Sequence, residues 1–393
     1  MKTSFPIPSA VAPRPSQRNR PLRVMYFARA PFVSGAERAL LTSLRGINRN
    51  AVEPALILGC ESDLLDITRQ WQIPVEVIAM PKRSLSTFCG WRRSLRAVRR
   101  AVGRFRPDLV HANDVPSCQA MSVVAGRCGI PRIVHIRWPV DATAFHWWAR
   151  GGIEQAICIS QWVRDQLSAV GGSEGTLPPN ILLPDPVSWT IGDNEEVEKS
   201  SEELIGPLRL GFAGQLIEAK GLDLIIHAVA RIPERKRPYV FVAGEDTQHR
   251  GTYRRHLQEL TADLGVSSHF EWLGFLSDVT QLYRRVDAMI CPSRIEPLGL
   301  VPLEAAQFSI PSIVSAVGGF RESVLPGQTG YLVQPTVEGW IEGLTVLGSR
   351  TSLQTLGQNA RRHVQIHYGF ELYQQRLLGI YRQLAIASPP PES

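Results

Sequence analysis

The sequence lacks the features of a secreted, zinc-binding or membrane-spanning protein. Its six cysteines form no Cys-x-x-Cys pair and no spacing typical of zinc ligands, so neither a disulfide framework nor a zinc site is indicated. No apolar run approaches the roughly 20 residues that a membrane-spanning helix needs. Residues 1–20 contain no apolar core of a signal peptide and predict a disordered tail. These absences favour a reduced, cytoplasmic protein.

Several nucleotide- and metal-binding signatures are absent as well. No Gly-x-Gly-x-x-Gly follows the first strand of either half, which argues against a NAD-dependent dehydrogenase, and no Walker spacing occurs. No Asp-x-Asp motif stands in a loop suited to metal binding. The composition is that of a globular protein, with 44% hydrophobic and 20% charged residues. A length of 393 residues predicts two domains.

Positive charge is concentrated in the first half of the chain. Residues 1–190 hold 24 Lys and Arg against 13 Asp and Glu, whereas residues 191–393 hold 19 against 23. The excess peaks in residues 81–106, which contain no acidic residue. Apolar residues recur there at helical spacing: Trp91, Leu95, Val98, Val102 and Phe105. The pattern predicts a helix whose basic side is either solvated or in contact with an anionic membrane surface.

Short apolar strands alternate with helical segments along the whole chain. The first half predicts strands at 22–28, 54–58, 74–78, 108–112, 132–136 and 156–160. After an acidic, polar stretch, the second half predicts strands in LRLGFAG, YVFVAGE, HFEWLG and AMICP, and a helical stretch at 352–387. Uniform short strands separated by helices are typical of mainly parallel, doubly wound sheets.

We therefore expect an α/β protein with two Rossmann-like, doubly wound domains that face each other across a cleft. The expected boundaries are a tail at 1–20, a first domain at 21–189, a linker at 190–207, a second domain at 208–360, and a C-terminal helix and tail at 361–393. The C-terminal helix is expected to cross back to the first domain. In folds of this kind, ligands bind at the carboxyl ends of the strands.

The segment GFAGQLIEAKGLD predicts a phosphate cradle. A strand ends at Gly214, where the missing side chain lets a ligand approach the backbone. Lys220 and Gly221 then open a helix, whose N-terminus attracts anions, and Lys220 adds a positive charge. The alternative is a tight strand-to-helix turn with a solvated lysine.

Two glutamates stand in the segment CPSRIEPLGLVPLEA. Pro297 and Gly299 keep the stretch after Glu296 out of a helix. Pro302 suits a first helical position, so Glu304 is expected close to a helix start. A carboxylate near a strand's carboxyl end can accept hydrogen bonds from two hydroxyl groups of a sugar ring or a ribose. The alternatives are a solvated loop residue for Glu296 and a helix-dipole partner for Glu304.

Three residues of the first half stand near strand ends. Gly35, in Ser-Gly-Ala-Glu after the first strand, can bring backbone N–H groups to a phosphate or sugar from the opposite domain. His111 ends one strand and His135 lies within another. A strand-end histidine that faces a cleft can hold a substrate hydroxyl or act as a base. The alternative for both is a buried histidine with satisfied hydrogen bonds.

Together these segments resemble the retaining glycosyltransferase family 4, the glycosyl transferases group 1, which has the GT-B fold. The resemblance extends from about Arg23 to Tyr381 and rests on motifs in the family's order: SGAE, FAGQLIEAKG, VAGE, EWLGF, CPSRIEPLGLVPLEA, GGFRES and GQTGYLV. It implies transfer of a hexose from a nucleotide-diphosphate sugar, with net retention and without metal or another cofactor. It also implies that the second domain binds the donor and the first the acceptor.

The resemblance and the strand-end positions together give a predicted site. The predicted donor-binding residues are Gly35, Gly214, Gln215, Lys220, Gly244, Gly274, Glu296, Gly299, Leu300 and Glu304. The predicted catalytic residues are Glu296, Lys220 and His111. The resemblance implies that Lys220 and the turn at Gly214 meet the diphosphate, and that Glu296 meets the donor sugar.

The remaining donor contacts implied by the resemblance involve the nucleoside and the phosphates. Glu304 would bind the ribose hydroxyls, and the loop after Gly274 would bind the base. The backbone at Gly299 and Leu300 would meet a phosphate. Gly35 would close on the phosphates from the first domain, so the site is expected to need both domains.

The sequence departs from the family pattern at four positions. Gln215 stands where an arginine usually follows the glycine, and Arg137 stands where many members have a cleft histidine. Asn113 replaces the second histidine of His-x-His, and Ser309 replaces a glycine. Arg137 and Asn113 are therefore predicted on the acceptor side. There Arg137 would restore a cation near the diphosphate or bind an anionic acceptor.

Three functions remain open. The first is transfer to a polysaccharide, glycolipid or lipid-linked acceptor, with residues 82–106 in peripheral contact with the anionic inner face of the plasma membrane and without a nucleic-acid partner. The second is a nucleotide-sugar epimerase or hydrolase on the same fold, which would turn over donor without an acceptor. The third, motivated by Gln215 and Arg137, is a non-catalytic donor-binding subunit of a glycan-assembly complex.

Overall fold

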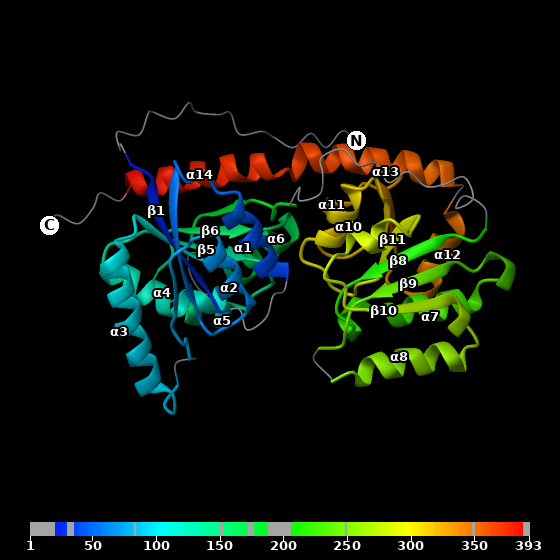
Figure 1. Cartoon of the computed structure of the whole chain (residues 1–393), viewed down its shortest axis with the longest axis horizontal. Helices are drawn as coiled ribbons and strands as arrows, with labels where there is room; N and C mark the ends of the chain where they lie inside the picture. The colour runs from blue at the N-terminus through cyan, green and yellow to red at the C-terminus, as the bar shows by residue number, and fades with distance from the viewer. Residues whose placement is uncertain are drawn as a thin grey trace.

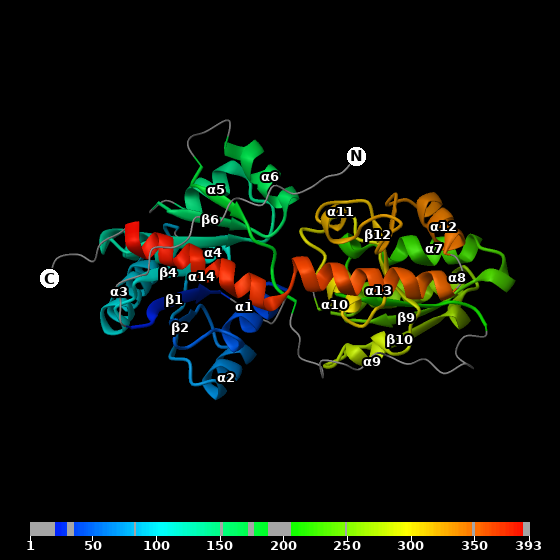
Figure 2. The ribbon, with the colours of Figure 1, turned by 90° about the horizontal axis from the view of Figure 1, so that it is seen from above.

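The structure, a computed structural model, describes residues 20–29, 35–81, 84–149, 152–171, 177–187, 206–247, 250–347 and 350–387. Nearly all of the predicted tail and linker lies outside these residues. The described chain forms two lobes that lie side by side (Figure 1). Two long helices, α13 (Arg350–His367) and α14 (Phe370–Ala387), run end to end across both lobes (Figures 1 and 2).

The first lobe is built on a seven-stranded parallel sheet with the order β3-β2-β1-β4-β5-β6-β7. Its strands are β1 (Leu22–Ala28), β2 (Val52–Leu58), β3 (Val75–Val77), β4 (Leu109–Ala112), β5 (Arg132–Ile136), β6 (Gln155–Cys158) and β7 (Asn180–Leu182). Its helices are α1 (Gly35–Arg45), α2 (Asp63–Gln70), α3 (Phe88–Phe105), α4 (Val115–Arg127), α5 (Ala142–Trp148) and α6 (Gln161–Gly171). The central strands are almost fully buried, because helices cover both faces of the sheet.

The second lobe is built on a six-stranded parallel sheet with the order β10-β9-β8-β11-β12-β13. Its strands are β8 (Arg209–Ala213), β9 (Tyr239–Ala243), β10 (Phe270–Gly274), β11 (Ala288–Cys291), β12 (Ser312–Ser315) and β13 (Gly330–Val333). The helical elements between them are η2 (Glu218–Lys220), α7 (Leu222–Arg231), η3 (Glu234–Lys236), α8 (Thr252–Asp263), η4 (Ser267–His269), α9 (Thr280–Tyr283), α10 (Leu300–Ala306) and α11 (Phe320–Ser323), and α12 (Val337–Val346) follows β13. Both sheets are doubly wound, which confirms the predicted α/β architecture.

The strand order reverses at one place in each sheet, between β1 and β4 in the first and between β8 and β11 in the second. At such a reversal the two connections leave toward opposite faces, so a crevice opens at the carboxyl ends of the strands. The two crevices meet between the lobes. A Cβ atom on Gly35, after β1, would lie 3.6 Å from Leu300 Cδ1, which follows β11. The fold therefore places the loops of both sheets against one ligand-binding space.

The C-terminal stretch differs from the single helical stretch predicted. α13 ends at His367 and α14 begins at Phe370, with Gly369, a weak helix former, between them. Residues of α13 belong to the core of the second lobe. Tyr373, Leu377 and Tyr381 of α14 pack into the core of the first lobe. The end of the chain therefore belongs to both lobes (Figure 2).

No helix among the described residues is long and apolar enough to cross a membrane. No group of three His, Cys, Asp or Glu side chains among them lies close enough together to hold a metal ion.

Candidate active site

An ion pair lies at the strand-order reversal of the second sheet. Lys220 belongs to the connection after β8, here called the lysine loop (residues 214–221), and Glu296 to the connection after β11, the glutamate loop (residues 292–299). Lys220 Nζ donates to Glu296 Oε2 at 2.7 Å, and Ser293 Oγ donates to the same oxygen at 3.4 Å. The lysine side chain is 32% exposed and the glutamate 15%. Two residues that the sequence singled out separately therefore form one charged pair that a ligand can reach.

Arg294 locks these two loops together. Its backbone N–H donates to Ala219 O at 2.8 Å, and its guanidinium makes two hydrogen bonds to the Asp223 carboxylate at 2.9 and 2.6 Å. A Cβ atom on Gly221 would lie 2.1 Å from Pro292 O, so only glycine allows the loops to approach this closely. Sequence reasoning missed Arg294 and Asp223. The sequence offered only one indication of this role, namely that Arg294 stands two residues before Glu296.

Glycines at the carboxyl ends of β8, β9 and β10 form a second support for the lysine loop. Gly214 N–H donates to Ala243 O at 3.0 Å, and Gly244 N–H donates to Gly274 O at 2.8 Å. A Cβ atom on Gly244 would lie 1.8 Å from Gly214 O. Gly244, predicted as a donor contact, is therefore first of all the residue that leaves room for the Gly214 turn. Gln215 follows this turn and is half-buried.

The Gly318-Gly319 pair supports the glutamate loop from the other side. Gly319 N–H donates to Glu296 O at 2.8 Å. A Cβ atom would lie 2.1 Å from Glu296 O if placed on Gly318, and 2.3 Å from Pro297 O if placed on Gly319. Side chains at either position would push the loop away. The glycines of the GGFRES motif therefore determine the position of the Glu296 backbone.

Glu304 lies on the helix that follows the glutamate loop. This helix, α10, begins at Leu300, two residues earlier than predicted, because Gly299 adopts a φ of +90° as its N-cap. Tyr283 Oη donates to Glu304 Oε2 at 3.3 Å. Burial raises the pKa of the Glu304 carboxyl, and the positive charge of Arg38 and the Tyr283 hydroxyl oppose that rise. Arg38 belongs to α1, so the environment of Glu304 includes the opposite lobe.

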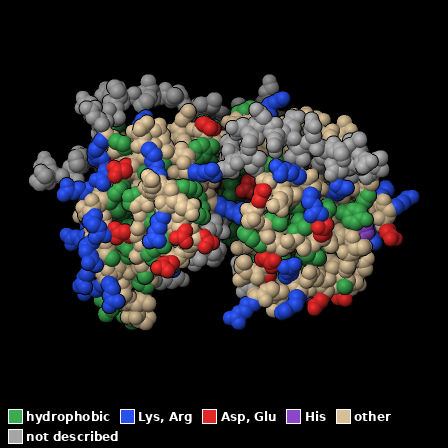
Figure 3. Space-filling model, viewed as in Figure 1, with side chains coloured by type: hydrophobic (Ala, Val, Ile, Leu, Met, Phe, Trp, Pro, Cys, Tyr) green, Lys and Arg blue, Asp and Glu red, His purple; other side chains and the backbone are tan. Residues whose placement is uncertain are grey.

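An open cleft of about 1180 Å³ lies between the two lobes. Its first-lobe wall includes Arg38 and Arg45 of α1. Its second-lobe wall includes Leu300, Glu304 and residues 277–280, which follow the strand whose end was predicted to meet the base. The hollow between the lobes is visible in Figure 3. The Lys220–Glu296 pair does not line this volume, but α10 joins the pair to Glu304 because it directly continues the glutamate loop.

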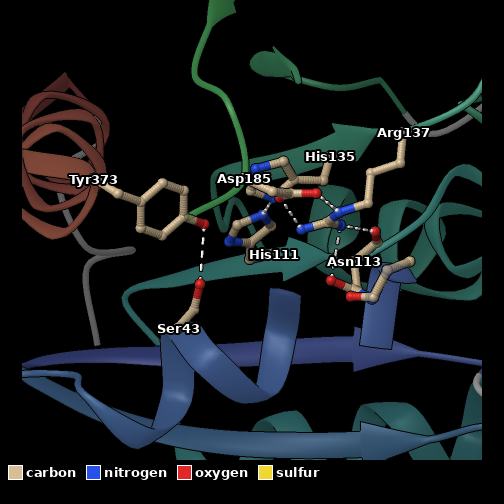
Figure 4. A network of polar contacts seen from close by, with 8 residues as sticks. Ser43, His111, Asn113, His135, Arg137, Asp185 and Tyr373 are labelled. Carbon is tan, nitrogen blue, oxygen red and sulfur yellow. Dashed lines mark hydrogen bonds and ion pairs between the residues drawn. The ribbon is translucent and has the colours of Figure 1, made fainter. Parts of the chain in front are cut away.

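His111 does not face the cleft. It is 2% exposed, and its ring nitrogens form hydrogen bonds with Tyr381 Oη at 2.6 Å and with His135 Nδ1 at 2.8 Å. His111 and His135 are shown in Figure 4. Tyr381, on α14, also hydrogen-bonds with Tyr26 of β1 at 3.0 Å. Burial and the positive charge of Arg137 lower the pKa of His111 to about 3. His111 therefore lies in the core, since α14 covers the strand end, and its catalytic role stays a prediction.

The Arg137 side chain is also largely buried. Its guanidinium donates to both Asp185 oxygens, at 2.7 and 2.8 Å, and to Asn113 Oδ1 at 2.8 Å (Figure 4). The side chains of Arg137 and Asp185 are only 9% and 2% exposed. A buried carboxylate therefore already pairs with Arg137, and the acceptor-side role of Arg137 stays a prediction. Asn113 Nδ2 donates to Ala36 O at 3.3 Å, so Asn113 positions the turn at Gly35.

Two protein-family models match the chain, one in each half. Residues 193–363 match "Glycosyl transferases group 1", and residues 34–174 match "Glycosyl transferase 4-like domain". An uncharacterized glycosyltransferase of Methanocaldococcus jannaschii is 31% identical over 175 residues, which is 44% of each chain. Glycogen synthase of Mycobacterium tuberculosis is 28% identical over 248 residues, which is 59% of this chain and 57% of that one. The chain thus spans about half the length of the curated relatives it matches.

The fold agrees with these matches. The structure of Anabaena HepE in complex with UDP is similar with a TM-score of 0.79 at 18% identity, over 92% of this chain and 100% of HepE. At that identity the likeness concerns the fold alone. It extends over both lobes, since it covers 92% of this chain. The chain therefore belongs to the glycosyl transferases group 1 family, glycosyltransferase family 4, and has the GT-B fold.

Proposed function

We propose that this protein is a retaining, metal-independent glycosyltransferase that moves a hexose from a nucleotide-diphosphate sugar to a polysaccharide, glycolipid or lipid-linked acceptor. The observation that carries the proposal is the Lys220–Glu296 pair at the strand-order reversal, with Glu304 on the helix that follows. One cation and two carboxylates correspond to the three polar parts of such a donor: the diphosphate, the sugar hydroxyls and the ribose hydroxyls. HepE, solved with UDP and with UDP-glucose, makes a uridine nucleotide the first candidate.

The chemistry follows from these groups. Donor binding exchanges the Lys220–Glu296 contact for contacts with the donor, so Lys220 meets the diphosphate and Glu296 the sugar hydroxyls. The bond between the sugar C1 and the phosphate oxygen breaks, and its electron pair stays on the diphosphate, where Lys220 stabilises the charge. The acceptor oxygen attacks C1 on the face that the diphosphate leaves, which retains the configuration. Because His111 is buried, we assign the acceptor proton to the departing phosphate oxygen.

A thermal-shift screen tests the donor. We expect UDP or its sugars to raise the melting temperature more than GDP, ADP or dTDP do, because a ligand at 100 times its Kd stabilises the native state by about 2.7 kcal/mol. The variant Lys220→Met is expected to lose most of that shift. If none of the four nucleotides shifted the transition, donor binding would be disproved.

Product analysis then separates the alternatives. Sugar transfer to an offered acceptor supports the proposal, and consumption of donor without any acceptor would favour an epimerase or hydrolase. Nucleotide binding with neither reaction would favour a donor-binding subunit. The stereochemistry of the product, read by NMR, decides between retention and inversion, and activity after treatment with a chelator tests metal independence.

We also propose that α3 contacts an anionic membrane surface on which a lipid-linked acceptor would lie. Val98 and Val102 face the core, whereas six arginines of α3 are exposed: Arg92, Arg93, Arg96, Arg99, Arg100 and Arg104. Leu85, before this helix, and Phe88, its first residue, are exposed apolar residues. Lys and Arg side chains gather along this edge of the first lobe (Figure 3). Of the basic residues predicted here, Lys82 and Arg83 lie outside the described residues.

Vesicle sedimentation tests this contact. The double variant Arg96→Glu/Arg100→Glu is expected to bind vesicles containing phosphatidylserine at least about 30-fold more weakly, since each basic residue near the headgroups contributes about 1 kcal/mol. The matched control is Arg235→Glu/Lys236→Glu, which makes the same charge change at exposed positions of the second lobe. Equal binding of both variants, or equal binding of wild type to neutral vesicles, would refute the proposed surface.

A further inference from the structure

The N-terminus of α6, in the first lobe, is capped by the second lobe. A helix leaves its first four N–H groups without partners inside the helix. Glu322 of α11 accepts the first two of α6: Gln161 N–H donates to Oε2 at 2.7 Å and Trp162 N–H to Oε1 at 2.8 Å. Ser160, the residue before α6, accepts the third from Val163 at 3.1 Å. The helix start is therefore satisfied jointly by both lobes.

The same residues reach the glutamate loop by two routes. Ser160 Oγ, fully buried, donates to Pro297 O at 2.6 Å, one residue after the predicted catalytic glutamate. Glu322 belongs to the short helix α11, whose preceding residue Gly319 donates to Glu296 O at 2.8 Å. The carbonyl of Glu322 accepts from Tyr368 Oη at 3.2 Å, at the junction of α13 and α14. The contact between the lobes is therefore connected by hydrogen bonds to the loop that carries Glu296.

The contact of Glu322 with α6 is stronger than one between neutral groups, because the acceptor is a carboxylate. A carboxylate that accepts two backbone N–H groups at a helix N-terminus also interacts favourably with the helix dipole. Glu322 is only partly exposed, and burial raises the pKa of its carboxyl while the two N–H groups oppose that rise. Apolar side chains also cross between the lobes, because Leu298 and Leu303 of the second lobe belong to the core cluster of the first. One of the contacts between the lobes therefore lies beside the glutamate loop.

We propose that Glu322 and Ser160 are positioning residues that form the pivot about which the two lobes close, and that they transmit the closure to Glu296. The contact between Glu322 and the start of α6 is kept during closure, while the rest of the first lobe changes its distance from the donor. Ser160 fixes the Glu296-Pro297 backbone to that pivot. Neither residue touches the donor, so their effect is on the geometry of the closed state and not on nucleotide affinity. The catalytic part of this inference rests on the proposed function.

The test compares Glu322→Ala, Glu322→Gln and Ser160→Ala with the control Thr336→Ala in the full chain. Thr336 also caps a helix, α12, by accepting from Gly339 N–H at 3.1 Å, but it belongs to the second lobe alone. Small-angle X-ray scattering with and without saturating UDP measures the separation of the lobes. Calorimetry measures the Kd for UDP, and a transfer assay measures kcat and KM separately.

For Glu322→Ala we expect a larger radius of gyration than wild type in the presence of UDP, and an unchanged Kd for UDP. We expect kcat to fall by about 10- to 100-fold, because misplacement of a catalytic group by an ångström has an effect of that size. Glu322→Gln, whose amide oxygen still accepts one N–H, should recover part of kcat. If Glu322→Ala did not fold, the same measurements would be made on Ser160→Ala, which removes only one hydroxyl and is expected to fold.

The pivot would be refuted if these variants matched Thr336→Ala in both scattering and kcat. It would also be refuted if Glu322→Ala weakened UDP binding as strongly as it lowered kcat, because that result indicates a general loss of structure. Scattering does not depend on turnover. If wild type transferred no sugar, the proposed function would fail, while the scattering data would still decide on the pivot.

Discussion

Replacement of Lys220 by methionine is expected to lower the transfer rate at saturating donor by about 10²–10³-fold, the usual effect of removing one group that stabilises charge in a transition state. Methionine keeps the length of the side chain but offers no positive charge to the departing diphosphate. Glu296→Gln is expected to lower the rate comparably, because the neutral amide cannot hold both the lysine and the sugar hydroxyls as a carboxylate does. Initial rates with the donor chosen by thermal shift measure both effects.

The fold should survive both substitutions. Lys220 is about one-third exposed, and ion pairs with such access to solvent contribute at most about 1 kcal/mol to stability. The matched control is the exposed pair Arg231–Glu338, at 2.7 Å in the same lobe. Arg231→Met and Glu338→Gln should retain the wild-type transfer rate. If Lys220→Met and Glu296→Gln also retained it, the assignment of the active site would be wrong.

Replacement of Arg137 by methionine is expected to destabilise the protein by about 3–5 kcal/mol, because Asp185 would be left as a buried, unpaired charge. The two side chains form a bidentate ion pair, and the Asp185 side chain is only 2% exposed. Asn113 would lose the hydrogen bond that Arg137 donates to its Oδ1. Urea unfolding of wild type and variant measures the difference in the free energy of unfolding.

A second substitution distinguishes a lost ion pair from lost packing. In Arg137→Met/Asp185→Leu both charges are removed, and we expect most of the lost stability to return, since two apolar side chains need no partner. The control Arg254→Met breaks a half-exposed pair with Glu245 and should cost no more than about 1 kcal/mol. A loss for Arg137→Met as small as that of the control would contradict the buried ion pair.

The sequence by itself determined the architecture and the local elements of the donor side. Alternating short strands and helices predicted two doubly wound sheets, because each element bears its own periodicity and turn residues. Lys220, Glu296 and the glycines around them stand in loops after strands, and the fold rule that ligands bind at the carboxyl ends of strands already pointed to them. These features can be predicted from the sequence because they depend on residues close together in the chain.

Only the tertiary structure determined what the polar side chains of the first lobe contact. His111 and Arg137 stand at strand ends just as the donor residues do, so their sequence context is equally suggestive. Their actual neighbours come from distant segments: Tyr381 on α14 covers His111, and Asp185, after β7, neutralises Arg137.

The pivot at Glu322 was equally invisible in the sequence, because its partners are backbone N–H groups that every residue except proline possesses. A polar side chain can bind a ligand only if no distant segment of the folded chain covers it or pairs with it. Local sequence patterns carry no information on such contacts, whereas the path of the folded chain does.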